Sequence, residues 1–178
     1  MAAVFNDTTI AFQNNGGIRA PFAVGNITYE DVLEVLPFDN TVDKVTMTGA
    51  GLKQSLENSA ALINYPDVFG YPGFGFQVAG LRFTIDVQSE NQNSRITNLR
   101  VLDLNGDFND LDVDKIYNVA LPSFLASGGE KEQKQTRGIF DENIIDHIVG
   151  DTIIFEAVRD YIRRNTPIHQ VRSRPVSS

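Results

Sequence analysis

The chain has no cysteine among its 178 residues. A disulfide framework and a thiolate metal site are therefore both excluded, although the absence does not by itself decide the cellular compartment. A chain of this length buries roughly 70% of its unfolded surface on folding and does not need such cross-links. We expect a single domain over residues 1–165, followed by a polar C-terminal tail over residues 166–178.

Basic charge and long apolar runs are also scarce. The chain carries 15 Lys and Arg against 23 Asp and Glu, a formal net charge of −8. Nucleic-acid-binding proteins normally carry a basic stripe, and the one short basic stretch here, residues 163–174, is interpreted as a solvated terminus. No run of about 18 apolar residues exists. We therefore expect no nucleic-acid partner and no membrane span, and neither a signal peptide nor a lipid-anchor signal within this chain.

Motifs for catalysis and for metal binding are missing as well. His147 and His169 are the only histidines, and no HExxH pattern surrounds either of them. The chain has no GxSxG nucleophile motif, and its glycine-rich segments lack the GK[ST] ending of a phosphate-binding P-loop. Acidic residues are plentiful, but their spacing selects no catalytic pair. We predict no catalytic residue and no cofactor or metal site in this chain, which is interpreted as a binding domain.

The hydrophobic pattern predicts an α+β fold, a single domain with a mixed β-sheet flanked by helices. Strands are expected at residues 8–12, 43–49, 80–86, 95–103 and 116–122. Helices are expected at residues 28–36, 48–63, 141–149 and 151–165, with most of residues 65–77 irregular. The first helix has Thr28 as its N-cap and ends before Pro37, and the last has Asp151 as its N-cap. On the last helix, Ile154, Val158, Tyr161 and Ile162 form the apolar stripe, and His147 lies on the helix before it.

The segment FQNNGGIRAP, residues 12–21, has the composition of an anion-binding loop. Gly16 and Gly17 allow main-chain amides to be exposed in a tight turn. Arg19 offers a planar, charged guanidinium suited to phosphate or carboxylate, and Asn14 or Asn15 can offer a donor and an acceptor to a polar ring. Taken alone, the same residues are also explained by a plain turn in which the arginine forms a surface salt bridge.

Two phenylalanines occupy similar positions in the chain. Phe38 follows the proline that ends a helix, and Phe124 follows a strand and a proline, ahead of Gly128 and Gly129. Each ring can fill a gap in the core or serve as a platform on which a base stacks. A stacked base would contribute about 1–3 kcal/mol per ring.

Taken together, five blocks of the sequence resemble the C-terminal domain of the 5′-nucleotidase/apyrase family. The blocks are NNGGIR (14–19), ITYEDVL (27–33), VLPFDNT (35–41), FGFQVAGLR (74–82) and LPSFLASGGE (121–130). They occur in the family's order and cover most of the chain up to Glu130. The VRDYI segment (158–162) is similar to the family's last helix.

The resemblance implies a nucleotide site. Phe38 and Phe124 would hold the base between them, and Asn14 would contact the edge of the base. Arg19 would lie at the phosphate end of the nucleotide. The glycine pairs Gly16–Gly17 and Gly128–Gly129 would frame the site, and Glu130 would hold the ribose hydroxyls. Asn15 stands where the family has a glycine, Glu130 where it has Asp, and Lys131–Glu132 where it has Gly-Phe.

The resemblance also implies a longer parent protein. In this family an N-terminal metallophosphoesterase domain holds two divalent metal ions, and none of its histidine and aspartate motifs occurs here. We therefore expect a substrate-binding domain, excised or naturally fragmentary, of a secreted or extracellular hydrolase acting on AMP, ADP or ATP, inactive by itself. The alternative is a non-catalytic protein of the same descent that binds a receptor or sequesters nucleotide.

Overall fold

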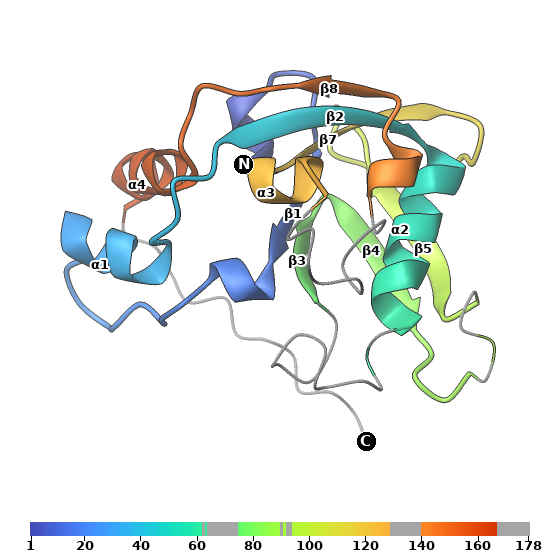
Figure 1. The fold of residues 1–178 in the computed structure, drawn as a ribbon, viewed down its shortest axis with the longest axis horizontal. Coiled ribbons are helices and arrows are strands. Elements are labelled where there is room, and N and C mark those ends of the chain that lie inside the picture. Colours follow the sequence, from blue (N-terminus) through green and yellow to red (C-terminus); the bar gives the residue numbers. More distant parts are fainter. Residues whose placement is uncertain (62, 64–74, 90, 92–93, 129–139, 167–178) are drawn as a thin grey trace.

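Two β-sheets and four α-helices make up the part of the chain that the computed structural model describes, which is residues 1–61, 63, 75–89, 91, 94–128 and 140–166 (Figure 1). The larger sheet has the strand order β3–β1–β7–β2–β8. Its members are β1 (Ile10–Asn14), β2 (Val42–Thr48), β3 (Phe76–Ala79), β7 (Ile116–Pro122) and β8 (Asp146–Ile148). Strands β1 and β7 are parallel and the other pairs are antiparallel, which confirms the predicted mixed sheet.

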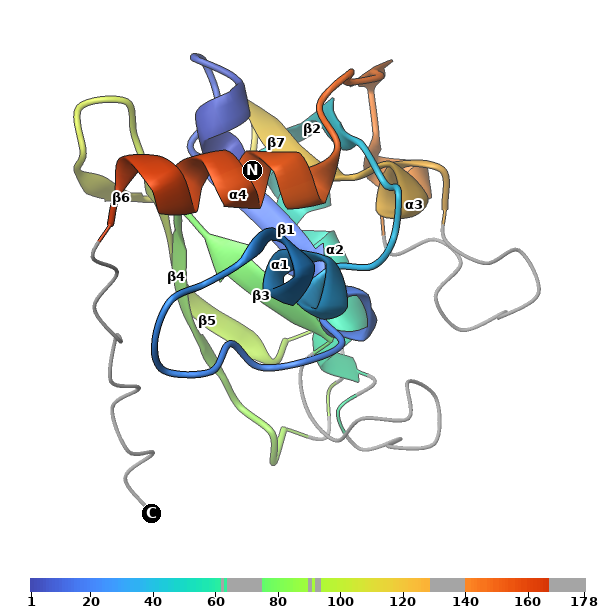
Figure 2. The same cartoon turned by 90° about the vertical axis from the view of Figure 1, so that its left-hand side faces the viewer.

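The smaller sheet is an antiparallel meander of β4 (Leu81–Ile85), β5 (Ile96–Leu102) and β6 (Phe108–Asp110). The α-helices are α1 (Tyr29–Val35), α2 (Gly49–Ala61), α3 (Ser123–Ala126) and α4 (Ile154–Arg164). Short 3₁₀ turns accompany them, among them η1 (Ala2–Val4), η2 (Asn15–Gly17) and η5 (Asp141–Asn143). Helices α1 and α4 lie together on one side of the large sheet, and α2 lies on the other side (Figures 1 and 2).

Alternation along the central strands creates one apolar cluster on each face of the large sheet. On β1, Ile10 and Phe12 join the cluster that packs under α2 and the small sheet, whereas Ala11 joins the cluster under α1 and α4. On β7, Ala120 likewise faces α1 and α4, opposite its neighbours Val119 and Leu121. Because both faces of these strands are buried, their sequence is a nearly continuous apolar run.

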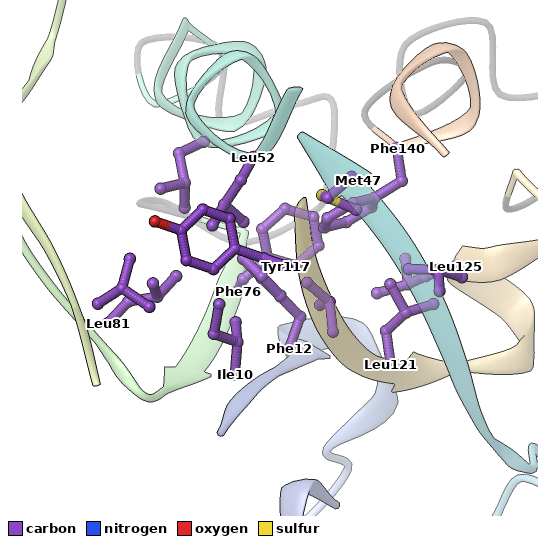
Figure 3. Packing of buried hydrophobic residues seen from close by; sticks show 14 of the residues in the cluster. Ile10, Phe12, Met47, Leu52, Phe76, Leu81, Tyr117, Leu121, Leu125 and Phe140 are labelled. Atoms are coloured by element: carbon purple, nitrogen blue, oxygen red, sulfur yellow. The ribbon is translucent and has the colours of Figure 1, made fainter. Parts of the chain in front are cut away.

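The larger cluster is built around aromatic rings that meet edge to face. The ring of Phe12 lies 5.7 Å from that of Phe76 and 5.1 Å from that of Phe140, measured between centroids. Leu52 from α2 and Tyr117 from β7 complete its centre (Figure 3). Edge-to-face pairs of this kind contribute about 0.5–1.5 kcal/mol beyond their buried area. The cluster fixes β1 and β3 side by side, and with them the turn that follows β1.

Helix α1 begins and ends where the sequence predicts. The Thr28 hydroxyl accepts a hydrogen bond from the Asp31 main-chain N–H at 3.2 Å, while the Asp31 carboxylate accepts from the Thr28 main-chain N–H at 2.6 Å. This reciprocal capping box satisfies two donors at the helix start. The same main-chain hydrogen bond, together with that of the Thr28 hydroxyl, lowers the pKa of Asp31. The helix is over by Leu36, so Pro37 and Phe38 leave it as a loop.

The predicted helix at residues 141–149 is wrong. Only the 3₁₀ turn η5 forms at its start, and Asp146–Ile148 is instead β8, an edge strand antiparallel to β2. Here pairing with β2 overrides the local preference for a helix. As a consequence, His147 lies on a strand and not on a helix.

The N-cap and the apolar stripe predicted for the last helix also need correction. Helix α4 begins at Ile154 with Ile153 as its N-cap, because the Thr152 carbonyl still accepts a hydrogen bond from the main-chain N–H of Val42 on β2. Asp151 therefore precedes the cap. On the buried side, Phe155 takes the place that the pattern gave to Tyr161, whose side chain is exposed.

The remaining differences concern short strands. Strand β1 runs to Asn14, two residues further than predicted, because Asn14 still pairs with Phe76. Strand β3 falls partly within residues 65–77, which were expected to be mostly irregular; residues 65–74 lie outside the described part. Strand β6 forms between the strands predicted at 95–103 and 116–122 and was not predicted; it follows a turn in which Gly106 has a φ of +95°. The predicted tail, 166–178, lies outside the described residues except for Thr166.

Candidate functional site

The predicted binding segments lie together at one end of the large sheet. Strands β1 and β7 are parallel, so their C-terminal ends lie at the same end of the sheet, where the antiparallel strand β2 begins. The turn 14–19 follows β1, the loop 37–41 leads into β2, and Phe124 follows β7. Topology thus brings together three segments that are far apart in the sequence.

The turn after β1 is a short 3₁₀ segment with ordinary negative φ values. Neither Asn15 nor the glycines Gly16 and Gly17 adopt positive φ, so a non-glycine residue at position 15 costs no backbone strain here. Asn15 is instead held through both its main chain and its side chain. Its main-chain N–H donates to the Gly75 carbonyl at 2.9 Å, and its side-chain oxygen accepts from the Gln77 amide at 2.9 Å.

Gly17 is buried beneath the side chain of Asn14. A Cβ atom on Gly17 would lie 3.0 Å from Oδ1 of Asn14 and 2.3 Å from Nε2 of Gln13. A larger residue at this position would therefore displace the side chain of Gln13 and crowd that of Asn14. Glycine here lets Asn14 fold against the turn, at the exposed end of β1.

Arg19 connects this turn to the end of α1. Its main-chain N–H donates to the Val35 carbonyl at 2.8 Å, and its guanidinium Nη1 donates to the Gly16 carbonyl at 3.2 Å. The guanidinium therefore lies over the glycine turn, on the exposed surface. A planar, charged guanidinium at the surface is suited to an anionic ligand.

Phe38 and Phe124 differ in their surroundings. Phe38 is 46% exposed, on the loop between α1 and β2. Phe124 is partly buried against the larger apolar cluster, in the first turn of α3. Within the described part of the chain, the two rings make no contact with each other.

The loops that carry these two rings are joined by hydrogen bonds. The Ser123 main-chain N–H donates to the Thr41 carbonyl at 2.9 Å, and the Thr41 N–H donates to the Ser123 hydroxyl at 3.2 Å. That hydroxyl lies 3.3 Å from Oδ1 of Asn40, to which it donates. The sequence alone did not predict this link. Its only signal was the position of Ser123 directly before Phe124.

The segment after α3 begins with a glycine that its conformation requires. Gly128 has a φ of +90°, and its main-chain N–H donates to the Leu125 carbonyl at 3.2 Å. A side chain is disfavoured at such a φ. Gly129 and Glu130, the other predicted members of this part of the site, lie outside the described residues.

A buried carboxylate behind the loop 37–41 was also missed. Asp43 on β2 is 1% exposed, and its oxygens accept from the Thr41 hydroxyl at 2.6 Å and from the Gly150 N–H at 3.1 Å. His147 on β8 places Nε2 2.7 Å from the same carboxylate. The two residues lie 104 positions apart in the sequence, so only the β2–β8 pairing brings them together.

The described residues include a cavity of about 560 Å³ at the opposite end of the sheet. It lies between the starts of β1 and β7 and the edge of the small sheet. Four carboxylates, those of Asp7, Asp103, Asp110 and Asp112, line it against a single Lys115. An excess of negative charge repels phosphate groups, so this cavity is unsuited to a nucleotide.

Two further properties concern metals and membranes. In residues that the structure describes, no three His, Cys, Asp or Glu side chains gather in a way that could hold a metal ion. Across the same residues, no helix combines the length and apolar character needed to cross a membrane.

The fold and the loops at its sheet end define a two-sheet α+β domain. A sequence model of the family described as 5′-nucleotidase, C-terminal domain, matches residues 2–136. The chain belongs to this family. Residues 2–136 include every predicted site residue.

Individual relatives agree with this assignment. Bovine 5′-nucleotidase is 31% identical over 179 residues, covering 93% of this chain, and the snake venom 5′-nucleotidase of Macrovipera lebetinus is 33% identical over 167 residues, covering 90%. The chain spans only 30% and 38% of the length of these two relatives. An apyrase of Tabanus yao is 30% identical over 126 residues, which is 68% of this chain and 22% of the apyrase.

Solved structures share the fold. The crystal structure of a 5′-nucleotidase precursor from Thermus thermophilus matches with a TM-score of 0.72 and 32% identity, over 88% of this chain and 29% of that one. The NAD nucleotidase of Haemophilus influenzae also gives a TM-score of 0.72, over 89% of this chain and 27% of that one, at 24% identity. The predicted α+β fold, a mixed sheet flanked by helices, is thereby confirmed.

Proposed function

We propose that this chain is the nucleotide-binding domain of a 5′-nucleotidase or apyrase. The observation that carries the proposal is the convergence of three segments at one end of the large sheet. The turn with Asn14 and Arg19, the loop with Phe38 and the α3 turn with Phe124 all lie there. Main-chain hydrogen bonds join Arg19 to the end of α1 at Val35, and Ser123 to Thr41. Family membership supplies the nucleotide as the ligand class.

In this proposal each part of a nucleotide meets a matching group. The exposed ring of Phe38 and the ring of Phe124 stack on the two faces of the base. Asn14 contacts its polar edge, and the guanidinium of Arg19 attracts the phosphates. Glu130 would hold the ribose hydroxyls.

Hydrolysis is assigned to the remainder of a longer protein. This chain spans only 30% of the bovine relative and 38% of the snake venom relative, and both are named 5′-nucleotidase. The two divalent metals of this family would activate the attacking water there. Because the described residues of this chain form no metal-binding group, we expect nucleotide binding without turnover from this chain alone. Action outside the cell belongs to the same proposal and is supported by the venom relative.

Calorimetric titration with AMP, ADP and ATP tests the binding proposal. We expect binding by the unmodified chain, and Phe38→Ala or Phe124→Ala to weaken it roughly 5- to 150-fold, which corresponds to about 1–3 kcal/mol per stacked ring. Phe108→Ala is a matched control, since Phe108 lies on β6 under the Arg82 guanidinium, 3.9 Å away, at the far sheet. It should leave the affinity unchanged.

Two results would contradict the proposal in different ways. A folded chain that binds none of the three nucleotides would favour the alternative, a non-catalytic interaction protein of the same family. Release of phosphate by the purified chain with added Mg²⁺, Mn²⁺ or Zn²⁺ would show that hydrolysis does not need the rest of a longer protein.

A further inference from the structure

Ser123 makes three hydrogen bonds to the loop that carries Phe38. Its main-chain N–H donates to the Thr41 carbonyl, and its hydroxyl both accepts from the Thr41 N–H and donates to the Asn40 side chain. A hydroxyl has one donor and two acceptor sites, so both kinds of site on Ser123 serve this one loop. Phe124 is the next residue after Ser123, and Phe38 comes two residues before Asn40.

Thr41 is also held by a hydrogen bond to a residue of β2. Its hydroxyl donates to the buried carboxylate of Asp43 at 2.6 Å. Asp43 is in turn fixed by the Gly150 N–H and by Nε2 of His147. The loop is also held at Asn40, whose carbonyl accepts from the Ile154 N–H at 2.9 Å. Thr41 is therefore a fixed point, held between Asp43 on β2 and Ser123 at the start of α3.

The stem of the loop is fixed while its aromatic tip is exposed. Asp39 and Phe38 are both exposed, whereas Asn40 and Thr41 are partly buried. The separation of the Phe38 and Phe124 rings thus depends on how firmly Thr41 is tied to Ser123. No such tie is needed to complete the sheet, because Thr41 lies just before the β2–β7 pairing, which begins at Val42 and Pro122.

We propose that Ser123 is a positioning residue for nucleotide binding, whose hydroxyl sets the spacing of the two aromatic rings. This inference rests on the proposed function, in which Phe38 and Phe124 enclose the base. Ser123 touches no ligand in it and acts through the loop 38–41. Its main-chain bond to Thr41 persists whatever side chain is present, so removing the hydroxyl loosens the loop and leaves the fold in place.

Three variants separate this role from a general effect on folding. Ser123→Ala removes both hydroxyl bonds, and Ser123→Thr restores a hydroxyl at the same position. Ser127→Ala is the matched control, because the Ser127 hydroxyl donates only within its own turn, to the carbonyls of Ser123 and Phe124 at 2.9 and 3.2 Å. Each variant is examined by AMP and ATP titration, by thermal unfolding and by hydrogen exchange at the Thr41 amide.

We expect Ser123→Ala to weaken nucleotide binding about tenfold and to speed exchange of the Thr41 amide by a similar factor. Ser123→Thr should recover most of both losses, and Ser127→Ala should match the unmodified chain in both. Should Ser123→Ala fail to fold, Ser123→Cys keeps the shape with a much weaker donor and must show the same two losses.

The outcomes distinguish this inference from the function on which it rests. Unchanged affinity in Ser123→Ala, with binding by the unmodified chain, overturns the positioning role alone. Equal losses in Ser123→Thr and Ser123→Ala do so too. An unmodified chain that binds no nucleotide overturns the proposed function, and the positioning role falls with it.

Discussion

Glu57→Gln is expected to destabilise the fold strongly, although it removes only a charge. Glu57 lies on α2 and is 2% exposed. Its carboxylate accepts from the Arg95 main-chain N–H at 2.8 Å and from the Ile96 N–H at 3.1 Å. These two N–H groups lie at the start of β5, so the Glu57 side chain links α2 to the small sheet.

The magnitude follows from the number of acceptors. Oε2 accepts from both main-chain N–H groups, whereas Oε1 accepts from Ile96 alone, so a glutamine oxygen in the place of Oε2 puts the NH₂ group opposite the Ile96 N–H. The variant loses a hydrogen bond to a charged acceptor, worth about 1.5–3 kcal/mol, and buries an NH₂ donor that faces another donor, at a cost of about 1–3 kcal/mol. Burying a neutral amide in place of a carboxylate offsets part of this. We expect a net loss of about 2–4 kcal/mol in the free energy of unfolding.

Urea unfolding followed by circular dichroism measures this loss as a lower midpoint at an unchanged slope. Thermal unfolding should shift down by roughly 5–15 °C. Glu34→Gln, the same change on the exposed face of α1, should stay within about 0.5 kcal/mol of the unmodified chain. If the two variants lose equal stability, the carboxylate of Glu57 does not hold β5 and the reasoning is wrong.

Two further predictions concern the backbone conformation of glycines and the charge of one carboxylate. Gly80→Ala should cost about 2–5 kcal/mol, because Gly80 has a φ of +73° and its Cβ would lie 2.1 Å from the Thr9 carbonyl oxygen; Gly106→Ala, at a φ of +95° with open space around it, should cost about 1–2 kcal/mol. Equal losses in urea unfolding would refute the clash. The pKa of Asp103 is lowered from 3.8, chiefly by a hydrogen bond from the Asp107 main-chain N–H. The ionised Asp103 side chain therefore stabilises the fold above pH 3.8. This contribution disappears as the pH falls through the lower pKa that Asp103 has in the folded chain. Asp103→Asn should therefore be less stable than the unmodified chain at about pH 7, with a gap that narrows in unfolding curves below about pH 4; a gap independent of pH would contradict this.

Local signals in the sequence were sufficient where the interacting groups are neighbours in the chain. The capping box of Thr28 and Asp31 is complete within four residues, and Pro37 ends α1 by its own geometry. The apolar runs of the central strands were recognisable because the large sheet buries them on both faces. Family membership, predicted from five blocks of the sequence, is confirmed. The binding roles of the residues in those blocks stay a prediction.

Local signals failed where a distant strand decides the conformation. Residues 141–149 carry Ile144, Ile145, Ile148 and Val149 at a spacing that suits a helix, but Asp146–Ile148 pairs with the free edge of β2 as β8. Strands β3 and β6 have only four and three residues, and each is held by a longer neighbour. Such pairings depend on loop closure and packing, which a short window of sequence does not contain.

The sequence by itself determined the fold class, the central strands, the helix starting after Thr28 and the set of residues proposed to bind nucleotide. Only the tertiary structure decided how those residues are held. Ser123 meets Thr41 across 82 positions of the chain, and His147 meets Asp43 across 104. Because β1 and β7 are parallel neighbours, their C-terminal ends lie at the same end of the sheet. Residues there can form a hydrogen bond although they are far apart in the sequence. The contact on which the proposed positioning role rests, that of Ser123 with Thr41, therefore exists only in the folded chain.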